Sequence, residues 1–131
     1  MPLGTLLGLL YLVTYLTFGV LGLQREAGER RLPRWALLAM LVTFPLTALG
    51  AFAYLADLDA PGLSLAWRGV FLLIVASNGA EASLAYQALL REHEAAGEEA
   101  ETRRASVLAV AVSYLLLELP AVVMNFRFAF P

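Results

Sequence analysis

Two glutamates, Glu81 and Glu118, stand inside long apolar stretches of the sequence. Within a membrane, a carboxyl group can carry a proton, bind a cation or form a hydrogen bond with a neighbouring helix. A charged side chain at the centre of a bilayer costs at least about 2.5 kcal/mol, so such residues usually face a partner or a water-filled path. Glu81 and Glu118 are therefore the residues whose types and positions could do chemistry in this chain.

The remaining side-chain chemistry is limited. The 131 residues include no cysteine and a single histidine, His93, which lies outside the apolar stretches. A chain without cysteine has no disulfides, thiolate nucleophiles or cysteine-ligated metal centres, and no phosphate-binding, dinucleotide-binding or HExxH motif is present. A net charge of −2 gives no basis for binding nucleic acid. We therefore expect no metal site, no cofactor held by this chain's own ligands and no enzymatic reaction.

Four apolar runs must position the two glutamates. The chain is 60% hydrophobic and 15% charged, whereas a soluble domain is roughly 45 to 50% apolar. Each run has about 20 residues or more, which is enough to cross a hydrocarbon core of about 30 Å at 1.5 Å per residue. The runs predict a single all-α membrane domain over residues 1–131, an antiparallel up-and-down bundle. Its transmembrane helices are expected at about 3–23, 35–56, 65–90 and 105–126.

The distribution of arginine predicts how the bundle is oriented. Arginines concentrate in segments 24–34 and 91–104, whereas segment 57–64 contains none. By the positive-inside rule, 24–34 and 91–104 are cytoplasmic loops, 57–64 is an outer loop, and both termini lie on the outer side. Arginine is the only basic residue besides His93, and this arginine-only composition, rich in alanine and leucine, fits a bacterial inner membrane. We therefore expect a multi-pass protein of a bacterial inner (plasma) membrane.

Polar residues share faces with both glutamates. At 100° per residue, Asn78 lies on the same face of the third helix as Glu81, and Tyr114 and Asn125 lie on the same face of the fourth helix as Glu118. A proline just beyond Glu118 is expected to bend that helix, and Tyr114, four residues back, is the expected local partner of Glu118. The candidate intramembrane polar, ion-binding or ligand-binding residues are Asn78, Glu81, Tyr114, Glu118 and Asn125.

Small residues predict where helices approach one another closely. In membranes, glycine, alanine and serine are enriched at helix–helix contacts. On the third helix they gather on the side opposite Glu81, so protein is expected on both sides of this helix, which favours contact with another subunit. The candidate packing residues are Gly4, Gly8, Gly69, Ala76, Gly79, Ala80 and Ser83.

Two local expectations concern the outer end of the bundle. Ser64 is placed to cap the first turn of the third helix. Trp67 and Tyr54, together with the C-terminal sequence FRFAF, are expected to form an aromatic belt at the membrane surface.

Three interpretations of Glu81 and Glu118 remain open. They can be hydrogen-bonded contacts between helices, worth about 0.6 to 2 kcal/mol each, or proton or cation sites on a transport path. They can also bind the headgroup of a lipid, quinone or pigment, or an arginine of a partner subunit. The sequence favours a small non-catalytic subunit in a homo-oligomer or larger membrane complex, with lipids, other membrane subunits or copies of itself as partners. The alternative is a proton- or ion-coupled small transporter or channel that uses both glutamates.

Overall fold

Four long helices account for most of the chain. The computed structural model describes residues 1–29 and 32–131. The helices are α1 (Leu3–Glu29), α2 (Arg34–Leu55), α3 (Pro61–Ala95) and α4 (Ala100–Ala129). The described residues contain no strand, and all four helices are long and apolar enough to cross a membrane. The prediction of an all-helical protein with four membrane-spanning candidates is therefore confirmed.

The connections between helices are shorter than the sequence patterns indicated. α3 begins at Pro61 because proline fits the first turn of a helix, where its missing N–H costs nothing. Ser64 consequently lies inside α3, and its predicted role as an N-cap is wrong. α3 also continues to Ala95, and the chain reverses at Gly97, whose φ of 73° is readily adopted only by glycine. Arg30 and Arg31, which contribute to the predicted charge asymmetry, lie outside the described residues.

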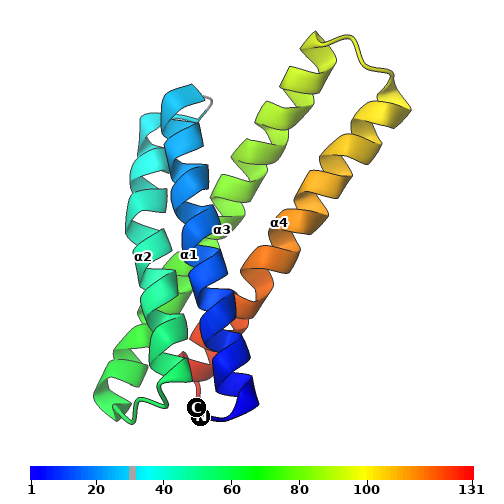
Figure 1. Ribbon diagram of the computed structural model, residues 1–131. Helices are drawn as coiled ribbons and strands as arrows, with labels where there is room; N and C mark the ends of the chain where they lie inside the picture. Colours follow the sequence, from blue (N-terminus) through cyan, green and yellow to red (C-terminus); the bar gives the residue numbers. More distant parts are fainter. Residues whose placement is uncertain (30–31) are drawn as a thin grey trace.

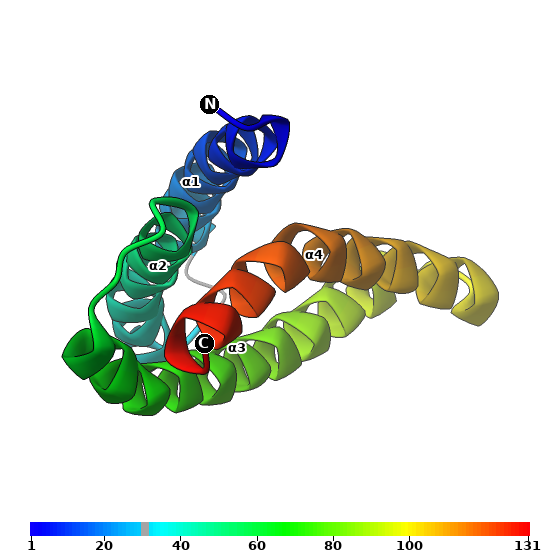
Figure 2. The same ribbon diagram turned by 90° about the horizontal axis from the view of Figure 1, so that it is seen from below.

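The helices alternate in direction, so that both termini lie beside the α2–α3 turn (Figure 1). We call this the terminal end and the opposite end of the molecule the far end. The α3–α4 pair leans away from the α1–α2 pair towards the far end, and from below the two pairs form the arms of a V (Figure 2). α4 packs against both α2 and α3, whereas α1 packs chiefly against α2.

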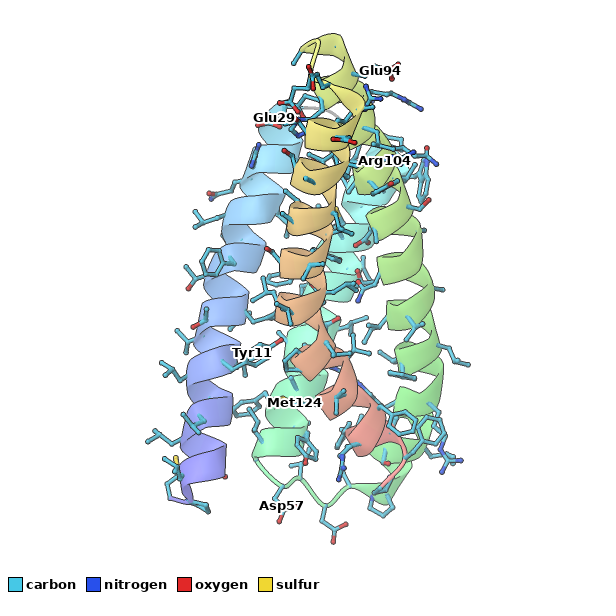
Figure 3. All side chains as sticks on the ribbon, turned by 90° about the vertical axis from the view of Figure 1, so that its right-hand side faces the viewer. Tyr11, Glu29, Asp57, Glu94, Arg104 and Met124 are labelled. Atoms are coloured by element: carbon cyan, nitrogen blue, oxygen red, sulfur yellow. The ribbon has the colours of Figure 1, made fainter. Side chains whose placement is uncertain are left out.

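Charged residues gather at the two ends of the molecule. Asp57 lies at the terminal end, and Glu29, Glu94 and Arg104 lie towards the far end (Figure 3). The region between them is largely apolar, as a membrane-spanning layer requires. Buried carboxyl groups in that region therefore stand apart from the charges at the ends.

The tightest packing lies towards the terminal end. One cluster joins α1, α2 and α4 and contains Leu12, Tyr15, Ala48, Ala51 and Ala121. A second cluster joins α2, α3 and α4 and contains Ala53, Trp67, Phe128 and Ala129. The alanines have short side chains, so the helices that carry them can approach closely.

Side-chain bonds from α3 hold the end of α4. The Ser64 hydroxyl donates to the Phe128 carbonyl oxygen at 2.7 Å, and the Arg68 Nε donates to the Ala129 carbonyl oxygen at 3.2 Å. The Arg68 guanidinium also lies over the ring of Phe130, 4.9 Å from its centre, where the ring's negative face attracts it. These contacts satisfy carbonyl groups that the last turn of a helix otherwise leaves unpaired.

Candidate functional site

The two glutamates come from adjacent, antiparallel helices. Glu81 on α3 is 7% exposed, and Glu118 on α4 is half-buried. The two carboxyl groups lie within electrostatic range of each other. We call Glu81 and Glu118 the carboxyl pair.

Glu118 has a partner on α1. The Tyr15 hydroxyl lies 3.3 Å from the Glu118 Oε2 and donates a hydrogen bond to it. Tyr114, the partner expected from the sequence, lies within electrostatic range of both Glu118 and Glu81. The direct contact therefore crosses between helices, and Tyr114 contributes an uncharged hydroxyl to the same neighbourhood.

A second tyrosine of α1, Tyr11, forms hydrogen bonds with backbone groups of α4 beside the carboxyl pair. The Tyr11 hydroxyl donates to the Leu117 carbonyl and accepts from the Ala121 N–H at 3.1 Å. In an uninterrupted helix these two backbone groups bond to each other. Pro120 lies within this turn and lacks an N–H of its own. Tyr11, whose side chain extends from α1 towards α4 in Figure 3, therefore bridges a weakened turn next to Glu118.

Glu81 has fewer stabilising contacts. The Thr43 hydroxyl of α2 lies against its carboxyl group, but that hydroxyl donates its proton to the Ala39 carbonyl oxygen at 2.8 Å. The Glu81 Oε1 and the Asn78 Nδ2 are both buried and have no hydrogen-bond partner among the described residues. Such atoms in a folded protein call for a proton, an ion, a water molecule or a partner group.

Asn125 belongs to a different site. It lies two helical turns from Glu118, nearer the terminal end, and its side chain is completely buried. Its Oδ1 accepts from the Trp67 Nε1–H at 2.9 Å, and its Nδ2 donates to the carbonyl oxygens of Thr47 and Ala121, each at 2.8 Å. Asn125 thus joins α2, α3 and α4 with all of its bonds made inside the protein.

Trp67 was expected in an aromatic belt, and this prediction is wrong. The side chain is 5% exposed because its N–H reaches Asn125 and its ring packs edge-on against Phe128, with ring centres 5.8 Å apart. A buried indole is stable when its single polar group is satisfied in this way.

The small residues divide into covered and uncovered groups. Gly8 packs against Leu55 of α2, whereas Gly4 has no atom of another residue near its missing side chain. The predicted packing face of α3 is exposed along its length on this single chain. Its members are Gly69, Ala76, Gly79, Ala80 and Ser83.

The sequence did not single out Tyr11, Tyr15, Thr43 or Trp67 as members of polar sites. The signal for the tyrosines is their spacing of four residues, which places both on one face of α1. What the assembled groups can do is bind a proton or a small cation, or hold helices together. Comparison with models of protein families, with curated proteins and with solved structures found no match.

Proposed function

We propose that this chain is a non-catalytic, multi-pass membrane protein that works within an assembly, as a homo-oligomer or as a subunit of a larger membrane complex. The observation that carries the proposal is the uncovered small-residue face of α3, the set Gly69, Ala76, Gly79, Ala80 and Ser83. Neither Gly69 nor Gly79 has a neighbouring atom in the space that a side chain would fill. In a membrane, such a face allows the backbone of a second helix to approach closely and pack against it.

The position of the carboxyl pair is compatible with this role. Glu81 and Asn78 lie on the interior side of α3, opposite the small-residue face. α3 would thus have its own chain on one side and a partner on the other. We further propose that the membrane is a bacterial inner membrane, with both termini on the outer side, because arginine concentrates in segments 24–34 and 91–104, towards the far end.

Cross-linking tests the proposed contact directly. The chain contains no cysteine, so a single Ala80→Cys variant carries one thiol, on the small-residue face. The matched control is Leu116→Cys, because Leu116 is 70% exposed on α4 but lies away from that face. In a homo-oligomer, mild oxidation of membranes gives a disulfide-linked dimer with Ala80→Cys and far less with Leu116→Cys.

Measuring the size of the extracted particle also tests the case in which the partner is a different membrane protein rather than a second copy of this chain. After extraction in a mild detergent, the proposal expects a particle larger than one chain, containing either several copies or co-purifying membrane proteins. A monodisperse single chain, with no cross-linking above the Leu116→Cys control, contradicts the proposal.

A second candidate function is coupled transport of a proton or another cation. The observation that favours it is the buried, unpartnered Oε1 of Glu81 next to Glu118, because intramembrane carboxyl groups serve as proton or ion sites in pumps and transporters. In reconstituted vesicles, Glu81→Gln and Glu118→Gln are expected to abolish a proton- or cation-driven flux that Glu94→Gln, at the far end, preserves. Equal fluxes in all three variants and the wild type contradict this candidate.

A further inference from the structure

The surroundings of Glu81 leave one of its carboxyl oxygens, Oε1, without a donor. The Thr43 hydroxyl lies against the Glu81 carboxyl group and also 2.8 Å from the Ala39 carbonyl oxygen, and its single proton can serve only one of these two acceptors at a time. No described residue donates to the Glu81 Oε1. A carboxylate is stable in a low-dielectric interior only when several donors or an opposite charge reach it.

No opposite charge reaches the pair from the described residues. The groups that face it are uncharged hydroxyls: Tyr11 and Tyr15 from α1, Thr43 from α2 and Tyr114 from α4. None of the described arginines, nor His93, forms an ion pair with Glu81 or Glu118. Two carboxylates in such surroundings repel each other, and a single positive charge between them removes both the repulsion and part of the desolvation cost.

The two members of the carboxyl pair are not equivalent. Glu118 accepts a hydrogen bond from Tyr15 at 3.3 Å, which supports a negative charge on it. Glu81 receives no such bond at Oε1, and the Thr43 hydroxyl beside it is also within bonding distance of the Ala39 carbonyl oxygen. The difference favours a cation held at Glu81 and balanced by Glu118.

We propose that Glu81 and Glu118 together hold one small monovalent cation, either a proton or an alkali-metal ion. A proton would sit on the Glu81 carboxyl, which could then donate to the Thr43 oxygen. An alkali-metal ion would find oxygen ligands from Glu81, Thr43 and Glu118 on three helices, since hard cations prefer oxygen. Asn78 could add its amide oxygen by a half-turn of the amide group, which exchanges its nitrogen and oxygen.

This cation site rests on the second candidate function, coupled transport, and names the ion that the carboxyl pair would hold. Binding of the ion is therefore measured separately from its flux across the membrane. The full chain is reconstituted in vesicles of phosphatidylcholine and phosphatidylglycerol and treated with dicyclohexylcarbodiimide, which reacts with protonated carboxyl groups in apolar surroundings. Peptide mass spectrometry then reports the label at each glutamate. This mapping needs no variant, so it does not depend on whether a substitution folds.

Two arms of the experiment distinguish the cation. If the ligand is a proton, labelling of the carboxyl pair falls with increasing pH, by about tenfold for each unit beyond the titration point, and Na⁺ and K⁺ have no effect. If it is an alkali-metal ion, adding Na⁺ or K⁺ at constant pH protects the pair in a saturable way. In that case Glu118→Gln abolishes the protection of Glu81, and the control Glu94→Gln preserves it.

Infrared spectroscopy provides a second measurement that needs no access for a reagent. A protonated carboxyl band that disappears at high pH, or on addition of Na⁺ or K⁺, and is missing in Glu81→Gln supports the proposal. Labelling and an infrared band that are both insensitive to pH and salt overturn it. Cation binding without any flux would support the inference and contradict the transport function alone.

Discussion

Gly50→Ala is expected to disrupt the polar site that joins α2, α3 and α4. A methyl group at this position would overlap the Asn125 Oδ1 and lie 2.6 Å from the Trp67 Nε1. Neither atom can move freely, because they bond to each other and the Asn125 amide is also bonded to two carbonyl oxygens. The substitution must therefore separate the helices or break the bond between Asn125 and Trp67.

The size of the effect follows from three contributions. Overpacking a well-filled interior costs about 1–3 kcal/mol, and each lost polar bond between membrane helices costs about 0.6 kcal/mol. Replacing glycine by alanine within a helix returns about 1 kcal/mol. The free energy of unfolding is thus expected to fall by about 1–3 kcal/mol for Gly50→Ala. The matched control, Gly22→Ala on α1, meets no atom within 4 Å and is expected to be neutral or stabilising by up to about 1 kcal/mol.

Trp67 reports this change directly. The only other tryptophan, Trp35, is 57% exposed, and a Trp35→Phe background leaves the emission of Trp67 alone. Unfolding is followed in mixed micelles by titration with dodecyl sulfate. Gly50→Ala should unfold at lower detergent fraction and shift the native emission to longer wavelength. If Gly50→Ala and Gly22→Ala unfold together with the same emission, the packing assigned to Asn125 and Trp67 is wrong.

Three further predictions concern other parts of the molecule. A thiol-reactive, membrane-impermeant reagent should label Gly62→Cys only from outside the cell and Ala95→Cys only from inside. The reverse pattern contradicts the proposed orientation. Ala95 is chosen rather than Gly97 because Gly97 has a positive φ, which a cysteine would not readily adopt. Tyr15→Phe keeps the ring and removes the bond to Glu118, so the free energy of unfolding should fall by about 0.6 kcal/mol; an effect above about 2 kcal/mol would show that the ring packing had changed as well. Ser64→Ala leaves a carbonyl at the end of α4 without its 2.7 Å partner and should increase amide hydrogen exchange in the last turn of α4 but not at its start.

Sequence patterns predicted the helices better than the contacts between them. Hydropathy and length depend only on neighbouring residues, so the four spans could be recognised. The polar face of α4 could also be predicted, because helical periodicity places Glu118 and Asn125 in line, and both point inwards. Periodicity does not determine how one helix is rotated against another. The bond from Tyr15 to Glu118 was missed for this reason, and Asn125 could not be assigned to Trp67 rather than to the carboxyl pair.

The ends of α3 illustrate a second limit. Ser64 is a good N-cap by residue type, but Pro61 allows the helix to start a turn earlier, and the serine hydroxyl is then free to bond α4. From the sequence alone, Trp67 is placed like a tryptophan at the membrane surface, because its bond to the Asn125 amide on another helix cannot be seen there. Both errors arise because the competing partner is distant in sequence.

The Tyr11 hydroxyl ties α1 to the backbone of α4 at the turn that contains Pro120. It occupies the gap between the Leu117 carbonyl and the Ala121 N–H. If α1 withdrew by the length of a side chain, the Leu117 carbonyl and the Ala121 N–H would lose this partner and be left to bond to each other, as in an uninterrupted helix. Glu118 lies next to Leu117 and accepts its hydrogen bond from Tyr15 of the same helix α1, so it would lose that bond as well. Displacement of α1, the helix that packs least against α4, would in that case be coupled to the half-buried carboxyl group of Glu118.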